Sequence, residues 1–198
     1  MSQPVQAPVA PPGLRPDQVE RRLRERFPDV PFRRQEGAAV RDHTLYLPAD
    51  RLIEVCTFLR DDPALAFAML MSVSGVDLLP SEPRFEVVYH LLSLTHNARF
   101  VLKVQVPEAH PHVPTVCGVW PTANWHEREA YDFYGILFDG HPDLTRILLP
   151  DDWEGWPLRK DSPLGYQEVA FTHNTPGRTV PAPDLTELAP KKVKYRAH

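Results

Sequence analysis

Two neighbouring stretches of strand-like sequence place the strongest constraint on how this chain folds. In residues 99–106, RFVLKVQV, apolar and polar side chains alternate, which is the period of a strand with one buried face. The preceding residues 84–94, RFEVVYHLLSL, are apolar on both faces, as in a strand at the centre of a sheet. Only the four residues THNA separate the two stretches, so we expect an antiparallel hairpin.

Sequence periodicity predicts further elements ahead of this hairpin. Pro16 suits the start of a helix, and the apolar residues Val19, Leu23 and Phe27 follow it at i, i+4 and i+8. This spacing predicts an amphipathic helix over 16–27. We expect a strand over 38–47, where leucines alternate with a tyrosine. A second helix is expected over 49–60, because its apolar residues share one side.

The segment after this second helix has the features of another helix start. Asp62 followed by Pro63 suits an N-cap with proline at the first helical position. The apolar sequence ALAFAMLM, residues 64–71, then predicts a short buried helix. On this interpretation Met69 and Met71 fill gaps in the core, a common use of methionine.

Together these elements predict an α+β fold, a small mixed or antiparallel sheet with helices packed on it, followed by an extended C-terminal tail. Proline makes up 23 of 198 residues, where roughly 5% is usual, and it favours extended backbone. We therefore expect a disordered tail over 1–13 and the α+β domain over 14–150. Residues 151–198 are expected to form a proline-rich strap that wraps a partner.

Composition argues against several classes of function. Two cysteines, Cys56 and Cys117, are too few for an iron–sulfur cluster held by four thiolates. The chain has neither GxGxxG nor GxxxxGK[ST] for nucleotide phosphates, and its net charge of −4 gives no basic footprint for nucleic acid. No stretch reaches the ~20 apolar residues that span a bilayer, and the N-terminus lacks the features of a secretory signal. We expect no cofactor in this chain.

Charged residues are densest in a predicted helix over 121–134, which Gly135 ends. Arg128 precedes Asp132 by four residues, so the two are expected to pair on the helix surface. Its acids are expected to be held by backbone amides and by Arg128 or other basic groups. These acids are Glu127, Glu129 and Asp132.

A metal site in a freestanding hydrolase is the competing interpretation of this helix. Potential ligands occupy positions i, i+3 and i+6, namely His126, Glu129 and Asp132. Further histidines that would complete the set are His110, His112 and His141. Helical metal sites usually draw such ligands from two helices, and no second helix of this kind is predicted. The metal site is therefore the less favoured interpretation.

After an acidic loop, DDWEG at 151–155, residues 156–165, WPLRKDSPLG, are expected to be extended because prolines and a glycine interrupt them. Trp153 and Trp156 each carry ~200 Å² of surface that is costly to leave in water. We expect them to be buried either in this domain or in a partner. The residues assigned to partner binding are Trp153, Trp156, Pro157, Arg159, Lys160 and Asp161.

Four motifs in fixed order resemble the signature of a known family. They are EREAYDFYG at 127–135, GHPDL at 140–144, RIL at 146–148 and PLRKDSPLG at 157–165. This pattern is similar to that of the 30-kilodalton subunits of respiratory complex I, which in bacteria are the C subunits of the proton-translocating NADH:quinone oxidoreductase. Weaker similarity covers most of 45–165. The signature residues are Glu127, Arg128, Glu129, Asp132, Gly135, His141 and Arg146.

The resemblance implies a structural and assembly role in the hydrophilic arm of that complex, without catalytic residues. It implies two partners, the quinone-site subunit that is similar to a hydrogenase large subunit and the subunit that holds the terminal cluster. FMN and the iron–sulfur clusters would belong to other subunits, and the chain would lie peripherally on the cytoplasmic side of the inner membrane. The alternative parent complexes are a related membrane hydrogenase and a ferredoxin-fed quinone reductase.

Overall fold

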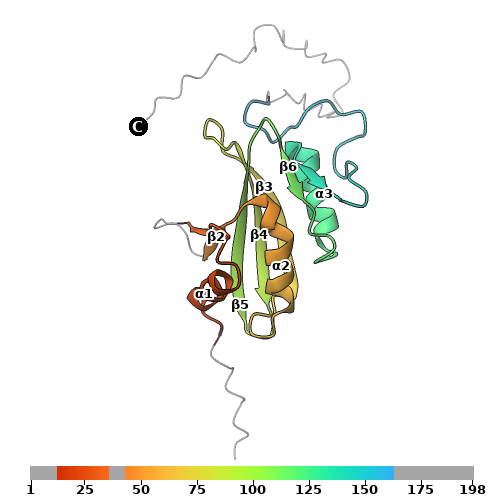
Figure 1. Ribbon diagram of the computed structural model, residues 1–198. Coiled ribbons are helices and arrows are strands. Elements are labelled where there is room, and N and C mark those ends of the chain that lie inside the picture. Colours follow the sequence, from red (N-terminus) through yellow and green to blue (C-terminus); the bar gives the residue numbers. More distant parts are fainter. Residues whose placement is uncertain (1–12, 36–42, 163–198) are drawn as a thin grey trace, which may run out of the picture.

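A five-stranded mixed sheet forms the centre of the fold (Figure 1). The computed structural model describes residues 13–35 and 43–162 of the chain. The helices in this part are α1 (Pro16–Arg26), α2 (Leu52–Asp61), α3 (Ala123–Tyr134) and the short 3₁₀ helix η1 (Ala49–Arg51). The strands are β1 (Arg33–Arg34), β2 (Thr44–Tyr46), β3 (Met69–Asp77), β4 (Phe85–Ser93), β5 (Ala98–Val106), β6 (His112–Pro114) and β7 (Leu137–Asp139).

The strands lie in the order β1-β2-β5-β4-β3. β4 pairs antiparallel with β5 and with β3, so the predicted hairpin over 84–106 is confirmed. β2 runs parallel to β5, which makes the sheet mixed, and β6 and β7 form a separate parallel pair. The α+β fold class predicted from the sequence is confirmed.

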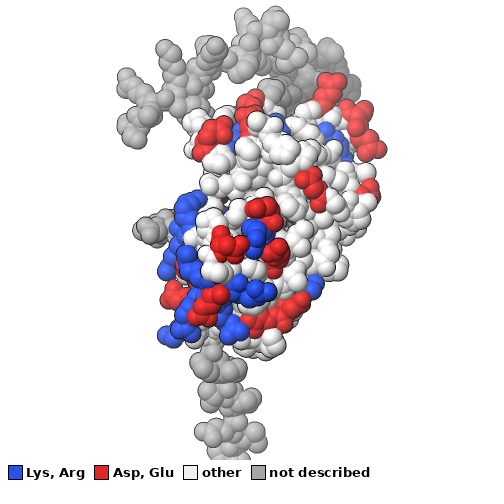
Figure 2. All heavy atoms as spheres, viewed as in Figure 1, with Lys and Arg blue, Asp and Glu red and all other residues white. Residues whose placement is uncertain are grey.

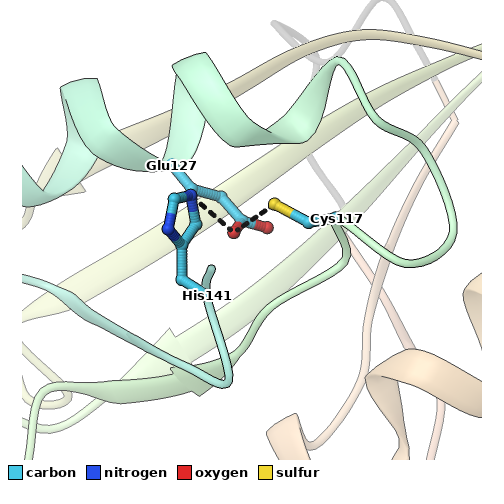
Figure 3. A group of neighbouring side chains, drawn as sticks. All are labelled: Cys117, Glu127 and His141. Atoms are coloured by element: carbon cyan, nitrogen blue, oxygen red, sulfur yellow. Dashed lines mark hydrogen bonds and ion pairs between the residues drawn. The ribbon is translucent and has the colours of Figure 1, made fainter. Parts of the chain in front are cut away.

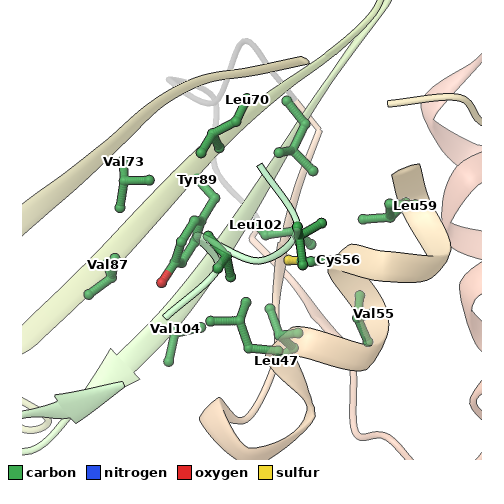
Figure 4. Close-up of a cluster of buried hydrophobic side chains, with 14 of the residues drawn as sticks. Leu47, Val55, Cys56, Leu59, Leu70, Val73, Val87, Tyr89, Leu102 and Val104 are labelled. Atoms are coloured by element: carbon green, nitrogen blue, oxygen red, sulfur yellow. The ribbon is translucent and has the colours of Figure 1, made fainter. Parts of the chain in front are cut away.

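All three helices contribute to one hydrophobic core on one face of the sheet. The strands supply alternate residues to it, such as Val87 and Tyr89 of β4 and Val104 of β5, each 0% exposed. α2 adds Val55 and Cys56, which point toward these strand residues (Figure 4). Burial of these side chains is the main stabilising contribution to the domain, at roughly 25 cal/mol per Å² of apolar surface removed from water.

The prediction of a helix over 64–71 is wrong. The chain turns after Asp62, Ala66 takes a positive φ of 45°, and β3 begins at Met69. Pairing of β3 with β4 outweighs the local helix signal, because a short apolar run fits either structure. Met69 and Met71 are 44% and 40% exposed rather than core filler.

The other predicted elements agree with the structure to within a few residues. The helices over 16–27 and 49–60 correspond to α1 and to η1 with α2. Of the strand predicted over 38–47, residues 44–46 form β2, and residues 38–42 lie outside the described part. Most of the expected tail over 1–13 and residues 163–198 of the strap also lie outside it.

Charge is distributed unevenly over the molecule. Figure 2 shows basic side chains gathered over α1 and the adjacent β1–β2 edge of the sheet. The side that carries α3 shows fewer charges, many of them acidic (Figure 2). None of the helices in residues 13–35 and 43–162 has the length and apolar character that a membrane span requires.

Candidate functional site

Helix α3 and the loop that wraps around it hold most of the signature residues. We call residues 140–162 the wrapping loop; Figure 1 shows it passing around α3 at the upper right. α3 itself packs against β3 so closely that a Cβ atom added to Gly75 would lie 2.6 Å from the ring of Tyr134. The helix ends at Gly135, whose φ of 71° is left-handed, a conformation that glycine adopts without strain.

Asp132 fixes the first part of the wrapping loop. Its side chain is fully buried, and Oδ2 accepts hydrogen bonds from the amides of Ile147, Leu148 and Leu149 at 3.1, 2.8 and 2.9 Å. Oδ1 forms an ion pair with Arg146 at 2.8 Å. Burial by itself raises the pKa of Asp132, but these amides and the Arg146 guanidinium outweigh it and hold the pKa below its ordinary value.

Two arginines bind the backbone carbonyls of the same loop. Arg128 donates to the carbonyl oxygens of Thr145 at 3.0 Å and Arg146 at 2.9 Å. Arg146 donates in turn to the carbonyls of Trp153 and Gly155, at 3.0 and 3.3 Å. The sequence-based pairing of Arg128 with Asp132 is therefore corrected, since Arg146 is the arginine that Asp132 binds.

Glu127 lies in a second buried cluster, between Cys117 and His141 (Figure 3). It is 0% exposed and accepts hydrogen bonds from the Thr115 hydroxyl, the Val116 amide at 2.8 Å and the Cys117 thiol at 3.4 Å. Burial raises the pKa of Glu127 despite these donors. The cluster ties α3 to the segment that follows β6.

The possible metal-ligating atoms of Cys117, Glu127 and His141 lie within 4.8 Å of one another. They already take part in hydrogen bonds within the chain, however. His141 Nδ1 accepts a hydrogen bond from the amide of Asp143 at 3.0 Å, so Nε2 carries the proton and faces the Asn124 carbonyl at 3.2 Å. Burial raises the pKa of the Cys117 thiol to about 11, which keeps it protonated at neutral pH. Because a metal requires a thiolate and a free imidazole lone pair, this arrangement suits hydrogen bonding better than ligation.

The metal ligands considered from the sequence are not brought together. Within residues 13–35 and 43–162, two groups of three side chains bring their possible ligand atoms within 4.8 Å of one another, Cys117–Glu127–His141 and Asp17–Glu20–His43. Asp132 is buried and saturated with amides, whereas Glu129 is exposed. Two further candidates, His110 and His112, stack on each other with their ring centroids 4.2 Å apart, and His126 of α3 belongs to neither group.

A buried arginine anchors the far end of the wrapping loop. The side chain of Arg84 is 2% exposed and binds both oxygens of Asp77 and both oxygens of Asp161. Glu108 pairs with the same guanidinium. The amide of Lys160 donates to Asp77 Oδ2 at 2.8 Å, so the loop is held through both its backbone and its side chains.

The tryptophans expected to be buried have different environments. Trp156 is partly buried and packs edge-on against Tyr131, with the ring centroids 5.3 Å apart. A Cβ atom on Gly135 would lie 2.5 Å from the Trp156 ring, and Arg159 donates to the Tyr134 carbonyl at 2.7 Å. Trp153 is 45% exposed. Within this domain, Trp156 is therefore covered only in part and Trp153 is left exposed.

Several residues of the site carry no recognisable signal in the sequence. Arg84, Asp77 and Glu108 form the anchor, and Thr115 supplies a donor to Glu127. The one available sign is the arginine at the start of an otherwise apolar strand. Its partners are distant in the sequence and could not be identified from spacing.

Comparisons with known proteins agree with this geometry. Residues 45–168 match the family described as respiratory-chain NADH dehydrogenase, 30 Kd subunit. The C subunit of the NADH-quinone oxidoreductase of Roseiflexus sp. (strain RS-1) is 54% identical over 156 residues, which cover 79% of this chain and 88% of that protein. The corresponding C subunit of Herpetosiphon aurantiacus is 49% identical, over 79% of this chain and 89% of the relative.

Two solved structures are also similar. A trypsin-resistant fragment of Nqo5 superposes with a TM-score of 0.54 at 38% identity, covering 64% of this chain and 98% of the fragment. A chain of the membrane-bound sulfane sulfur reductase, an archaeal respiratory membrane complex, has a TM-score of 0.62 at 24% identity, covering 75% of this chain and 85% of that one, and shows the fold alone. The family match spans most of the sheet, α3 and its wrapping loop, and the chain therefore belongs to the family of 30-kilodalton subunits of the respiratory-chain NADH dehydrogenase.

Proposed function

We propose that this chain is a non-catalytic structural subunit of an NADH-quinone oxidoreductase, and that α3 with its wrapping loop is its docking surface. One observation carries the proposal. The buried and paired charges of the signature bind the chain's own backbone: Asp132 binds three amides, and Arg128 and Arg146 bind carbonyls. Groups engaged in this way maintain the shape of a surface and are not free for proton transfer or ligation.

The shape so maintained presents apolar side chains to the solvent. Leu148 is 61% exposed, Trp153 45% and Leu158 50%. Their backbone is nevertheless held: Asp132 accepts from the Leu148 amide, Arg146 donates to the Trp153 carbonyl, and the Leu158 amide donates to the carbonyl of residue 133. Large apolar groups on an ordered loop are typical anchors of a protein interface, and tryptophan is enriched among residues that dominate binding energy. Trp153, Trp156, Pro157, Arg159, Lys160 and Asp161 remain our partner-binding assignment.

The relatives named as C subunits of NADH-quinone oxidoreductases support the choice of complex. We propose that the partners are the quinone-site subunit that is similar to a hydrogenase large subunit and the subunit that holds the terminal cluster. FMN and the iron–sulfur clusters then reside in other subunits, in keeping with only two cysteines here. The complex lies at the cell membrane with this chain on its cytoplasmic side.

The test uses the intact complex. Leu148→Glu combined with Trp153→Glu places two charges on the docking surface without altering the bonds of Asp132. We expect about tenfold less chain to copurify with the complex, because burying unpaired charges in an interface costs more than the roughly 1.4 kcal/mol that a factor of ten represents. NADH:quinone activity should fall in proportion to the amount of assembled complex.

The matched control is Leu94→Glu, which adds a charge at a position that is 69% exposed on the β4–β5 hairpin. It should leave both assembly and activity unchanged. If the double variant assembled fully yet failed to reduce quinone, the chain would take part in the chemistry and the structural role would be wrong.

A further inference from the structure

β3 is an edge strand with little protection against a further strand. It is the last strand of the sheet and pairs with β4 alone within the described residues. Its sequence up to Val76, MLMSVSGV, contains no charge and no proline, although natural edge strands usually carry such groups to prevent pairing. A register shift interrupts the strand between Leu70 and Ser72, but the pairing from Ser72 to Asp77 is continuous.

A groove runs along this edge between β3 and α3. Its volume is about 200 Å³, and its lining includes Val73, Ser74 and Gly75 from the strand and Phe133 from the helix. Leu158 of the wrapping loop closes one side. The groove is therefore continuous with the proposed docking surface, and beside Gly75 the ring of Tyr134 forms its wall.

Glu129 is the one residue of the signature that the site has not explained. It is exposed at the rim of this groove, and within residues 13–35 and 43–162 it has neither a hydrogen bond nor an ion pair. The other two acids of α3, Glu127 and Asp132, are saturated with donors from the chain itself. An unpaired carboxylate beside an uncharged strand edge favours the binding of a segment that carries a basic group.

We propose that the groove between β3 and α3 accepts an extended segment of a partner subunit, which adds a strand to the edge of β3 and places a lysine or arginine on Glu129. The backbone groups of β3 that point away from β4 supply the hydrogen bonds, as in strand addition generally. Alternate side chains of the segment enter the groove against Phe133 and Leu158. This inference rests on the proposed function, since it requires a partner in the same complex.

The first test is site-specific photocrosslinking in the assembled complex. A photoreactive residue replaces Ser74, which is exposed on β3, and in a parallel control it replaces Gln105, which is exposed on β5. The expected result is a crosslink from position 74 to one extended segment of another subunit that contains a lysine or arginine, with the control position yielding no such product. A crosslink to a helix, to a second copy of this chain or to its own residues 163–198 would overturn the proposal.

The second test concerns the charge. Glu129→Lys should reduce the crosslink from position 74 by about tenfold, because like charges then face each other across the interface. Exchanging the basic residue found by crosslinking for glutamate should restore it. Glu25→Lys, the same change on α1, should leave the yield unchanged.

The two proposals fail in different ways. If the Glu129→Lys complex assembled with an unaltered crosslink, the groove assignment would be wrong while the proposed function stood. If the chain with its native Glu129 neither copurified with the complex nor crosslinked to another subunit, both proposals would be wrong.

Discussion

Asp132 illustrates how one carboxylate can direct the path of an irregular loop. Three consecutive amides, those of residues 147–149, converge on a single oxygen, and Arg146 occupies the other. Consecutive amides that point in one direction form a site for an anion. The loop has little regular hydrogen bonding of its own in this region, so its shape depends on Asp132 together with the arginines that bind its carbonyls.

Asp132→Asn tests that dependence. The amide oxygen of asparagine still accepts one or two of the bonds, but the ion pair with Arg146 is lost and its charge becomes unpaired. We expect the free energy of unfolding to fall by about 3 kcal/mol, as is usual when one partner of a buried pair is removed. Urea denaturation of the purified chain measures it, and Asp152→Asn, at an exposed position of the loop, should change it little. Equal values for the two variants would contradict the role of Asp132.

At this scale the sequence predicts the kind of bond but not the partner. The expectation that the acids of α3 are held by amides and basic groups agrees with the geometry of Glu127 and Asp132. It is wrong for Glu129, which is exposed and has no such partner within residues 13–35 and 43–162. The helical i, i+4 rule pointed to Arg128 for Asp132, whereas Arg146, fourteen residues further on, is the partner. Long-range folding decided this, because Arg128 is drawn to the carbonyls of the loop instead.

The end of α3 shows how one element positions the next. Gly135 ends the helix in a left-handed conformation and also lies directly under Trp156. A helix cap and a packing contact therefore depend on the same missing side chain. The wrapping loop approaches α3 more closely here than any residue with a Cβ would allow.

Gly135→Ala and Gly155→Ala separate these two contributions. Both glycines have left-handed φ values, 71° and 82°, but an added Cβ meets Trp156 at 2.5 Å in the first case and nothing within 4 Å in the second. Gly155→Ala should cost about 1 kcal/mol for the backbone alone. Gly135→Ala should cost at least about 1 kcal/mol more, because Trp156 must move. Thermal unfolding of both variants measures these changes in stability. Equal losses of stability would show that Trp156 moves away from the added Cβ without an energetic cost.

Among the secondary-structure elements, those with a clear local pattern were predictable. β5 alternates regularly and β4 and β5 are joined by a tight turn, so their pairing follows from neighbouring residues alone. β3 was misassigned because an apolar run without clear periodicity fits a buried helix as well as a strand. The parallel pairing of β2 with β5 joins segments more than fifty residues apart, and local sequence holds no information about it.

At the scale of the whole molecule, Arg84 connects segments that are far apart in the chain. Asp77 ends β3, Glu108 follows β5 and Asp161 belongs to the wrapping loop, and all three bind this guanidinium. Burial raises the pKa of Asp77, but the bonds from Arg84 and from the amides of Lys160 and Leu79 outweigh it and lower the pKa to about 2. Arg84 likewise lowers the pKa of Asp161.

These pKa shifts predict how the free energy of unfolding depends on pH. Because the folded-state pKa of Asp77 lies below its unfolded value of ~3.9, its contribution is fully present above about pH 4 and is lost as the pH falls through 2. We expect wild type and Asp77→Asn to differ most near pH 5, and the difference in unfolding free energy to shrink by about 2 kcal/mol by pH 2. Urea titrations across this range measure it, with Asp151→Asn as an exposed control. A difference independent of pH would show that Asp77 is not linked to Arg84 in this way.

The first part of the wrapping loop, up to Gly155, is held mainly through its main-chain amides and carbonyls, so its path does not depend on its exposed side chains. Asp132 binds amides of this part, and Arg128 and Arg146 bind its carbonyls, groups that nearly every amino acid carries. Exposed positions such as Leu148 and Trp153 are thus open to replacement while the loop keeps its course, much as the variable positions of an antibody loop are. We expect that a library randomised at these two positions and selected for binding to a related complex would yield variants that bind that complex. The path of the loop should stay the same in these variants.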